Sequence, residues 1–158
     1  MDLIFWRHAE AHDAAQGEDD LGRPLTSKGE RQAKRMAHWL NQALPATVRV
    51  LVSPALRAQQ TAHALERRAK TCQALAPDGT VDGLLEAARW PESREPVLVV
   101  GHQPTLGLAC ARLLLGPAAG DAAAPLRIKK AGVWWLRVRD HGDGHEVTLI
   151  AVRSPELP

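Results

Sequence analysis

Residues 3–8 read LIFWRH, and this stretch decides the fold expected for the whole chain. Four apolar residues in a row predict one short buried strand. Arg7 and His8 follow at its carboxyl end, which is where open α/β sheets bind ligands. A guanidinium donates two parallel hydrogen bonds to a phosphate, and a neutral imidazole is a nucleophile near neutral pH. Because Arg-His pairs are common by chance, the interpretation needs partners elsewhere in the chain.

Two further segments repeat this plan of a buried strand followed by a helix. Apolar runs at 48–52 and 97–100 predict strands, and helices are expected after them at 54–69 and 104–115. Another helix is expected at 28–43, between the first two strands. Strands that alternate with helices indicate a parallel sheet with right-handed crossovers.

The remaining segments are of other kinds. Residues 10–23 are polar and read as a loop, 84–89 as a short helix, and 117–125 as a flexible connection rich in small residues. Two strand-like runs, 133–138 and 146–152, are separated by turn residues and predict an antiparallel hairpin. The expected fold is therefore α/β: a three-layer α/β/α arrangement in which a mostly parallel central sheet has helices on both faces and a C-terminal antiparallel hairpin.

Composition sets bounds on the class of protein. The chain has 158 residues, of which 45% are hydrophobic, which suits one domain over residues 1–158 with a single core. Its net charge of +2 gives no reason to expect nucleic-acid binding, and no apolar run approaches the length of a membrane span. We find no signal peptide and expect a cytoplasmic protein. Cys72 and Cys110 are expected to be free thiols.

The ends of the second and third strands supply the partners that Arg7 and His8 need. Ser53 is expected to cap the second helix, which carries Arg57, and His102 follows the third strand directly. In a parallel sheet these ends share one edge, so two arginines and two histidines would surround one point. Singly, Arg57 could be a solvated surface residue and His102 a satisfied core histidine. Their joint placement favours a site for a tetrahedral dianion.

Four motifs carry a resemblance to a known family. Arg7-His8-Ala9 resembles the Arg-His-Gly signature of the histidine phosphatase (phosphoglycerate mutase-like) superfamily. Residues 24–33, PLTSKGERQA, and residues 53–62, SPALRAQQTA, are similar to its next two motifs, and VVGH at 99–102 matches the strand with its second histidine. The short length and DLGRPLT at 20–26 most resemble the small SixA-type phosphohistidine phosphatases of that superfamily.

The resemblance implies a mechanism and a set of site residues. His8 would attack phosphorus to form a phosphohistidine, which water then hydrolyses. Arg7, Arg57 and His102 would stabilise charge on the phosphoryl oxygens. Since the arginines already supply positive charge, we expect no metal and no cofactor. Arg23 is a candidate substrate-binding residue, for the phosphate or for an acidic partner, with an ordinary loop arginine as the alternative.

The sequence departs from the family pattern at two points. Ala9 replaces a glycine, which would cause strain if that position required positive φ. Larger members carry an acidic residue that acts as general acid, and Glu86 is the candidate for that role here. Glu86 can equally be interpreted as an ordinary glutamate on the surface of a helix.

This doubtful acid bears on the substrate. An alkyl phosphate needs a protonated leaving group, whereas the imidazole of phosphohistidine has a pKa near 6.5 and can leave already protonated. A chain this short has little length for a lid, so an open site is expected. We therefore expect a phosphohistidine-bearing protein of the phosphorelay type as substrate. The alternatives are a small phosphate ester, with Glu86 as general acid, and a non-catalytic phosphate-binding regulator.

Overall fold

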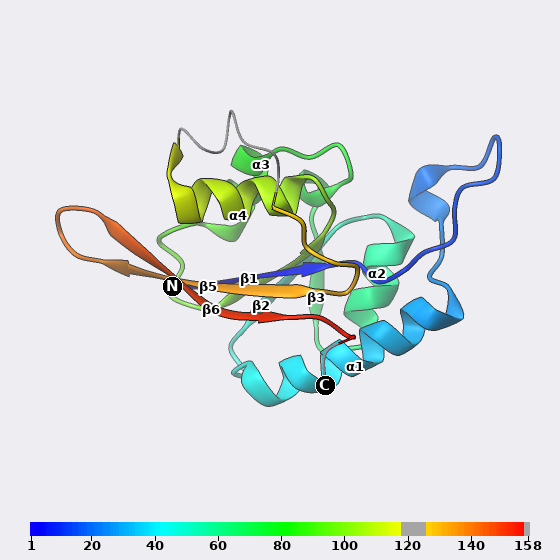
Figure 1. The fold of residues 1–158 in the computed structure, drawn as a ribbon, viewed down its shortest axis with the longest axis horizontal. Coiled ribbons are helices and arrows are strands. Elements are labelled where there is room, and N and C mark those ends of the chain that lie inside the picture. Colours follow the sequence, from blue (N-terminus) through cyan, green and yellow to red (C-terminus); the bar gives the residue numbers. More distant parts are fainter. Residues whose placement is uncertain (118–125, 157–158) are drawn as a thin grey trace.

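The computed structural model describes residues 1–117 and 126–156 (Figure 1). It is a six-stranded sheet with helices on both faces, and the connection expected at 117–125 lies, from residue 118 on, outside the described residues. The sheet order is β3-β2-β4-β1-β5-β6. The strands are β1 (Asp2–Arg7), β2 (Arg49–Val52), β3 (Ala69–Thr71), β4 (Val97–Gly101), β5 (Val133–Asp140) and β6 (His145–Arg153).

The pairing directions confirm the mostly parallel sheet with an antiparallel hairpin. Strands β1, β4, β2 and β3 run parallel to one another, whereas β5 is antiparallel to β1 and β6 is antiparallel to β5. The β5–β6 hairpin is longer than expected and projects beyond the rest of the sheet (Figure 1). Because β5 covers one side of β1, the strand that carries Arg7 lies inside the sheet and not at its edge.

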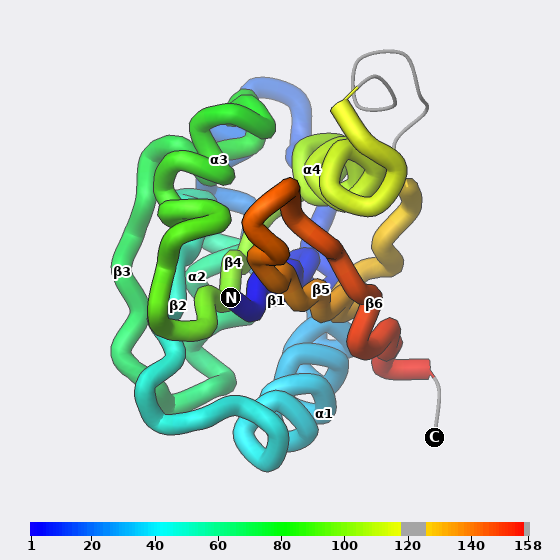
Figure 2. The backbone as a smooth tube through the Cα atoms, turned by 90° about the vertical axis from the view of Figure 1, so that its left-hand side faces the viewer, coloured from blue at the N-terminus to red at the C-terminus, as the bar shows by residue number. Residues whose placement is uncertain are grey.

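Helices cover both faces of the sheet (Figure 2). The first face is covered by α1 (Ser27–Ala43) and α2 (Leu56–His63), and the second by α3 (Val81–Ala88) and α4 (Thr105–Leu115). Side chains of β1 alternate between the two layers: Ile4 and Trp6 pack into the first and Leu3 and Phe5 into the second. Burial on both faces explains why this strand is an unbroken apolar run.

The second helix is shorter than the sequence predicts. We expected it at 54–69 with Ser53 as its cap, but α2 spans Leu56–His63 and its N-cap, Ala55, makes no side-chain hydrogen bond. The chain turns at Glu66, whose φ is 54°, and residues 69–71 pair with β2 as the short strand β3. No glycine or proline breaks the helical pattern there, so tertiary pairing with the exposed edge of β2 overrides local propensity.

Smaller differences concern the connecting segments. The polar loop at 10–23 contains a 3₁₀ turn, η1 (Asp20–Gly22), and a second 3₁₀ turn, η2 (Gln73–Leu75), precedes α3. Helix α3 starts three residues earlier than expected. Cys72 and Cys110 are both free. In the part of the chain that the structure describes, no helix has the length and apolar character that crossing a membrane requires.

Candidate active site

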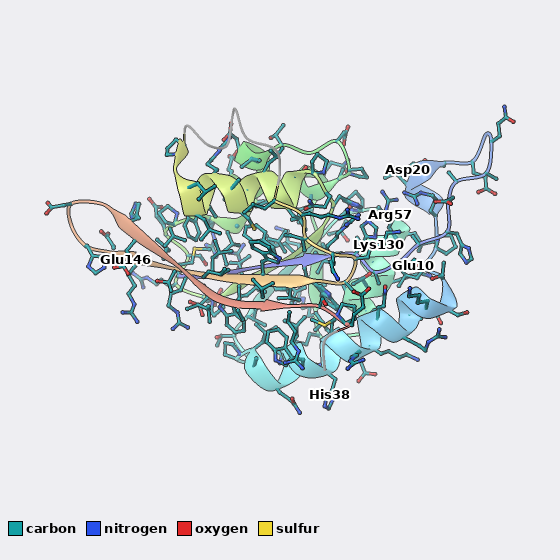
Figure 3. All side chains as sticks on the ribbon, viewed as in Figure 1. Glu10, Asp20, His38, Arg57, Lys130 and Glu146 are labelled. Carbon is teal, nitrogen blue, oxygen red and sulfur yellow. The ribbon has the colours of Figure 1, made fainter. Side chains whose placement is uncertain are left out.

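The carboxyl ends of three adjacent strands form the site. Strand β4 lies between β1 and β2, and Arg7 is in register with Gly101. The His8 backbone N–H donates to the Gly101 carbonyl at 3.0 Å. The rings of His8 and His102 are consequently neighbours, with centroids 5.1 Å apart. Figure 3 labels Arg57 at this same end of the molecule, close to Asp20 on the polar loop.

His8 is held in one tautomer. Its Nδ1 lies 2.7 Å from the carbonyl oxygen of Ala9, and a carbonyl only accepts, so Nδ1 carries the proton. The lone pair is therefore on Nε2. Burial, together with the nearby His102, Arg57 and Arg7, lowers the pKa of His8 to about 3, although the Ala9 carbonyl acts in the opposite direction. The imidazole is thus neutral at neutral pH and has the form that a nucleophile requires.

Two arginines stand beside it, Arg57 buried and Arg7 half-buried, and each is fixed through its terminal nitrogens. Arg7 Nη1 donates to the carbonyl of Ile128 at 2.8 Å. Arg57 donates to Asp20 twice, from Nη1 to the backbone carbonyl at 2.8 Å and from Nη2 to Oδ2 at 3.1 Å. In both residues Nε is buried and has no partner among the described residues. Burial lowers the pKa of both guanidinium groups, a cost that a bound anion would offset.

His102 is oriented by Ser53. Its Nε2 lies 2.7 Å from Ser53 Oγ, and this oxygen also accepts the backbone N–H of Ala55 at 3.2 Å. Among the described residues His102 Nε2 is the acceptor within reach of the Ser53 hydroxyl proton, which makes Nδ1 the protonated nitrogen of a neutral ring. Burial and the charge of Arg57 lower the pKa of His102 to about 4, so the ring is neutral at neutral pH. Nδ1 is buried without a partner among the described residues.

These groups together fit a phosphoryl group. Arg7 Nε, Arg57 Nε and His102 Nδ1 are three buried N–H donors, and such donors are almost always satisfied in proteins. A tetrahedral dianion has acceptor oxygens for all three. The lone pair of His8 Nε2 belongs to the same cluster, as an attacking group on phosphorus requires.

Asp20 is a site residue that sequence reasoning missed. Besides its two contacts with Arg57, its Oδ1 accepts Arg23 Nε at 3.0 Å. Burial raises the pKa of Asp20, but the hydrogen bonds and charges of Arg57 and Arg23 outweigh this and lower it. Arg23 also donates to the His12 carbonyl, so it reaches the site through Asp20. The polar loop offered several acids, and only tertiary structure singles out this one.

Comparison with known sequences identifies the family to which this site belongs. The profile of the histidine phosphatase superfamily (branch 1) matches residues 3–86. The chain belongs to the histidine phosphatase superfamily. It is 37% identical over 125 residues to phosphohistidine phosphatase SixA of Escherichia coli, covering 73% of this chain and 76% of that protein. An uncharacterized protein of Picosynechococcus is 39% identical over 168 residues, covering 99% of this chain and 98% of the other.

Solved structures of the same superfamily share the whole fold. A protein histidine phosphatase SixA complexed with tungstate superposes with a TM-score of 0.76 at 32% identity, covering 98% of this chain and 97% of that one. A putative SixA of Nakamurella multipartita superposes with a TM-score of 0.77 at 30% identity, covering 99% and 96%. The resemblance seen in the motifs is confirmed, and the chain is a histidine phosphatase.

The alanine that replaces the superfamily's glycine is unstrained. The non-glycine residues with positive φ in the described chain are Glu66, Arg89 and Ala131, so Ala9 has ordinary backbone geometry. Ala9 is fully buried, and its N–H donates to Thr61 Oγ1 at 3.0 Å. Thr61 in turn donates to the Arg57 carbonyl at 2.7 Å, which ties α2 to the segment after β1.

Glu86, the possible general acid, is not brought to the site. It is exposed near the end of α3 and lines a cavity with Arg89, Trp90 and residues 92–95, which lead into the amino end of β4. Arg49 at the start of β2 contacts the Ala87 carbonyl, which fixes this end of α3 at the amino edge of the sheet. Sequence order placed Glu86 after the second helix as in larger relatives, but α3 carries it to the opposite edge.

Among residues 1–117 and 126–156, no group of three or more His, Cys, Asp or Glu side chains is arranged to hold a metal ion.

Proposed function

We propose that this histidine phosphatase removes the phosphoryl group from phosphohistidine on a protein, through a phosphohistidine intermediate at His8 and without a metal. The observation that carries the proposal is the hydrogen bond from His8 Nδ1 to the Ala9 carbonyl, which leaves Nε2 as the nucleophile amid buried donors. The relative in E. coli is a phosphohistidine phosphatase, which supports the substrate class. The free thiols Cys72 and Cys110 support a cytoplasmic location.

The first step transfers the phosphoryl group to the enzyme. His8 Nε2 attacks phosphorus while the P–N bond to the substrate breaks. The substrate imidazole leaves as a neutral ring if its other nitrogen carries a proton, so no enzyme acid is needed. Arg7, Arg57 and His102 donate to the phosphoryl oxygens, where charge stabilisation supplies most of the catalysis.

The second step returns the enzyme to its starting state. Once Nε2 is phosphorylated, the ring of His8 is cationic because Nδ1 keeps its proton. The Ala9 carbonyl stabilises that charge through the same 2.7 Å hydrogen bond. Water then attacks phosphorus, the P–N bond breaks, and His8 leaves as a neutral imidazole. Inorganic phosphate is released with the protons of the water.

The chemistry of the leaving group favours phosphohistidine over an alkyl ester. The carboxylate that contacts the phosphate-binding residues, Asp20, is engaged by two arginines that lower its pKa, which makes it a poor proton donor. Glu86 is at the other edge of the sheet. An ester substrate would need an acid, whereas a P–N bond to imidazole does not.

The test compares substrates on one preparation of enzyme. Turnover is measured on a phosphohistidine-bearing protein and on a panel of phosphate esters, with His8→Ala and Glu86→Gln as variants. We expect the phosphohistidine protein to be hydrolysed at least tenfold faster, no turnover by His8→Ala, and less than a twofold change for Glu86→Gln. Faster turnover of esters than of the phosphohistidine protein, or loss of ester hydrolysis in Glu86→Gln, would establish the ester alternative. Failure to trap phosphate on His8 with any donor would favour the non-catalytic regulator.

A further inference from the structure

The loop that precedes β5 holds the catalytic pair from one side. The Arg7 N–H donates to the Gly132 carbonyl at 3.0 Å, and the Ala131 N–H donates to the His8 carbonyl at 3.1 Å. Trp6 Nε1 donates to the Ala131 carbonyl at 3.0 Å, and Arg7 Nη1 to the Ile128 carbonyl at 2.8 Å. Ile128 and Ala131 are fully buried. Four hydrogen bonds and two buried side chains therefore fix this loop against Arg7 and His8.

The same loop turns cationic side chains outward. Arg127 and Lys130, here called the basic strip, are exposed on either side of buried Ile128. Within residues 1–117 and 126–156 neither side chain forms a hydrogen bond or an ion pair, whereas Lys129 between them is paired with Glu156. The charge of Arg127 is close enough to act on Arg7, whose pKa it lowers after the larger effect of burial. Figure 3 labels Lys130 at the same end as Arg57.

The opposite side of the site has the opposite charge. The strand order is β2-β4-β1-β5, and the basic strip lies beside β1, just before β5. The Asp20 loop contacts Arg57 on α2, which follows β2 on the other side of β4. That loop also exposes Asp13, Glu18 and Asp19. A protein that docks over His8 consequently meets positive charge on one side and negative charge on the other, which orients it.

We propose that the basic strip is a docking surface for an acidic patch beside the phosphohistidine of the substrate protein. The inference rests on the proposed function and adds to it the side on which the partner binds and the charge it carries there. The strip is suited to this because its backbone is already fixed by the active site, so docking costs little ordering of the loop. Long cationic side chains on a fixed backbone can contact the surface of a protein substrate around its phosphohistidine. A small phosphorylated molecule has no such surface, so the strip should not affect its binding.

The experiment separates docking from chemistry. The double variant Arg127→Gln/Lys130→Gln is compared with wild type on two substrates that share a P–N bond: phosphoramidate, and a carrier protein phosphorylated on one surface histidine flanked by Asp and Glu. The control is Arg68→Gln/Arg94→Gln, which removes two exposed charges at the amino edge of the sheet. A second carrier, with Asn and Gln in place of the flanking acids, completes the set.

We expect kcat/KM on the acidic carrier to fall about tenfold in the strip variant at low salt, with the difference fading as salt screens the charges. The strip variant should differ less than twofold from wild type in kcat/KM on phosphoramidate and on the neutral carrier. The control variant should differ less than twofold from wild type on the acidic carrier. An unchanged rate on the acidic carrier, or an equal loss on phosphoramidate, would overturn the proposal.

A binding measurement keeps the two proposals distinguishable. The affinity of His8→Ala for the phosphorylated acidic carrier is measured with and without the two strip substitutions. Weakening by about tenfold supports the docking surface even if wild type hydrolyses neither substrate, in which case the proposed function alone fails. Equal affinities would exclude the strip whatever the turnover.

Discussion

The Ser53 hydroxyl lies 2.7 Å from His102 Nε2, and both groups are buried at the junction of β2 and β4. Ser53 Oγ accepts the Ala55 N–H, and among the described residues His102 Nε2 is the acceptor within reach of the hydroxyl proton. Ser53 is thus the residue that assigns the proton of His102 to Nδ1, where it can be donated to a phosphoryl oxygen. Sequence reasoning treated Ser53 as a helix cap, but the structure uses its oxygen for the second histidine.

Replacing Ser53 with alanine should reduce catalysis more than binding. Without the hydroxyl, a neutral His102 can carry its proton on either nitrogen, and the Nε2–H form would direct a lone pair at the phosphate. We expect kcat to fall about tenfold, as for a weakened transition-state donor, with KM changed less than threefold. Nitrogen NMR of the imidazole should show Nδ1–H in wild type and mixed tautomers in Ser53→Ala. A single unchanged tautomer with a lower kcat would contradict the role.

The low pKa values of the two buried histidines should make the protein less stable in mild acid. Their pKa values are about 3 for His8 and about 4 for His102, below the 6.5 of an unfolded histidine. Between pH 6.5 and 4 the unfolded chain binds more protons than the folded one, so stability falls as pH falls. From pH 7.5 to 5 each histidine should contribute a loss of about 1–2 kcal/mol.

Denaturant unfolding at these two pH values measures the effect. The variant His8→Asn, which does not titrate, should lose about 1–2 kcal/mol less than wild type over the same interval. The same low pKa predicts that the fraction of neutral His8 is constant from pH 5 to 8, so activity should not show a titration near 6.5 that belongs to the nucleophile. Equal pH dependence of unfolding in wild type and His8→Asn would contradict the lowered pKa.

Substitution of Asp20 should weaken the phosphate clamp. Asp20 holds both terminal nitrogens of Arg57, which leaves Nε for the substrate. In Asp20→Asn the charge is lost while the backbone contact to Arg57 remains, so Arg57 is held less firmly and KM should rise about tenfold. Because the Asp20 side chain is 53% exposed, the free energy of unfolding should change by less than about 1 kcal/mol.

The neighbouring carboxylate provides a matched control for that substitution. Asp19 accepts the Leu21 N–H in the same loop and, among the described residues, its carboxylate does not contact the arginines of the site. Asp19→Asn should leave KM within twofold of wild type. If both substitutions raise KM equally, the loop acts through its general charge rather than through the contact between Asp20 and Arg57.

Sequence reasoning was successful where a residue's position follows from an element's end. Arg7, His8 and His102 sit at the ends of unmistakable buried strands, so adjacency of β1 and β4 brought them together. It was unsuccessful where long-range contacts decide. The predicted helix ends at His63, six residues early, so that residues 69–71 can pair with β2. Glu86 is carried away from the site by the direction of α3. The role of Asp20 likewise depends on a contact across 37 positions of the chain.

The close approach of α1 to the segment after β1 leads to a final prediction. A Cβ on Gly29 would lie 1.9 Å from the Glu10 carbonyl oxygen, which is backbone and cannot move aside as a side chain does. That carbonyl also accepts the Thr26 N–H at the start of α1. Gly29→Ala should therefore force α1 away from the segment that follows His8 and cost about 1–3 kcal/mol of stability. Gly22→Ala is the control, since nothing lies within 4 Å of its Cβ position.

Thermal unfolding should separate the two variants, and kcat should fall in Gly29→Ala because Ala9, which orients His8, adjoins the displaced residue. Equal melting temperatures would mean that this approach of helix and loop is not tight in solution.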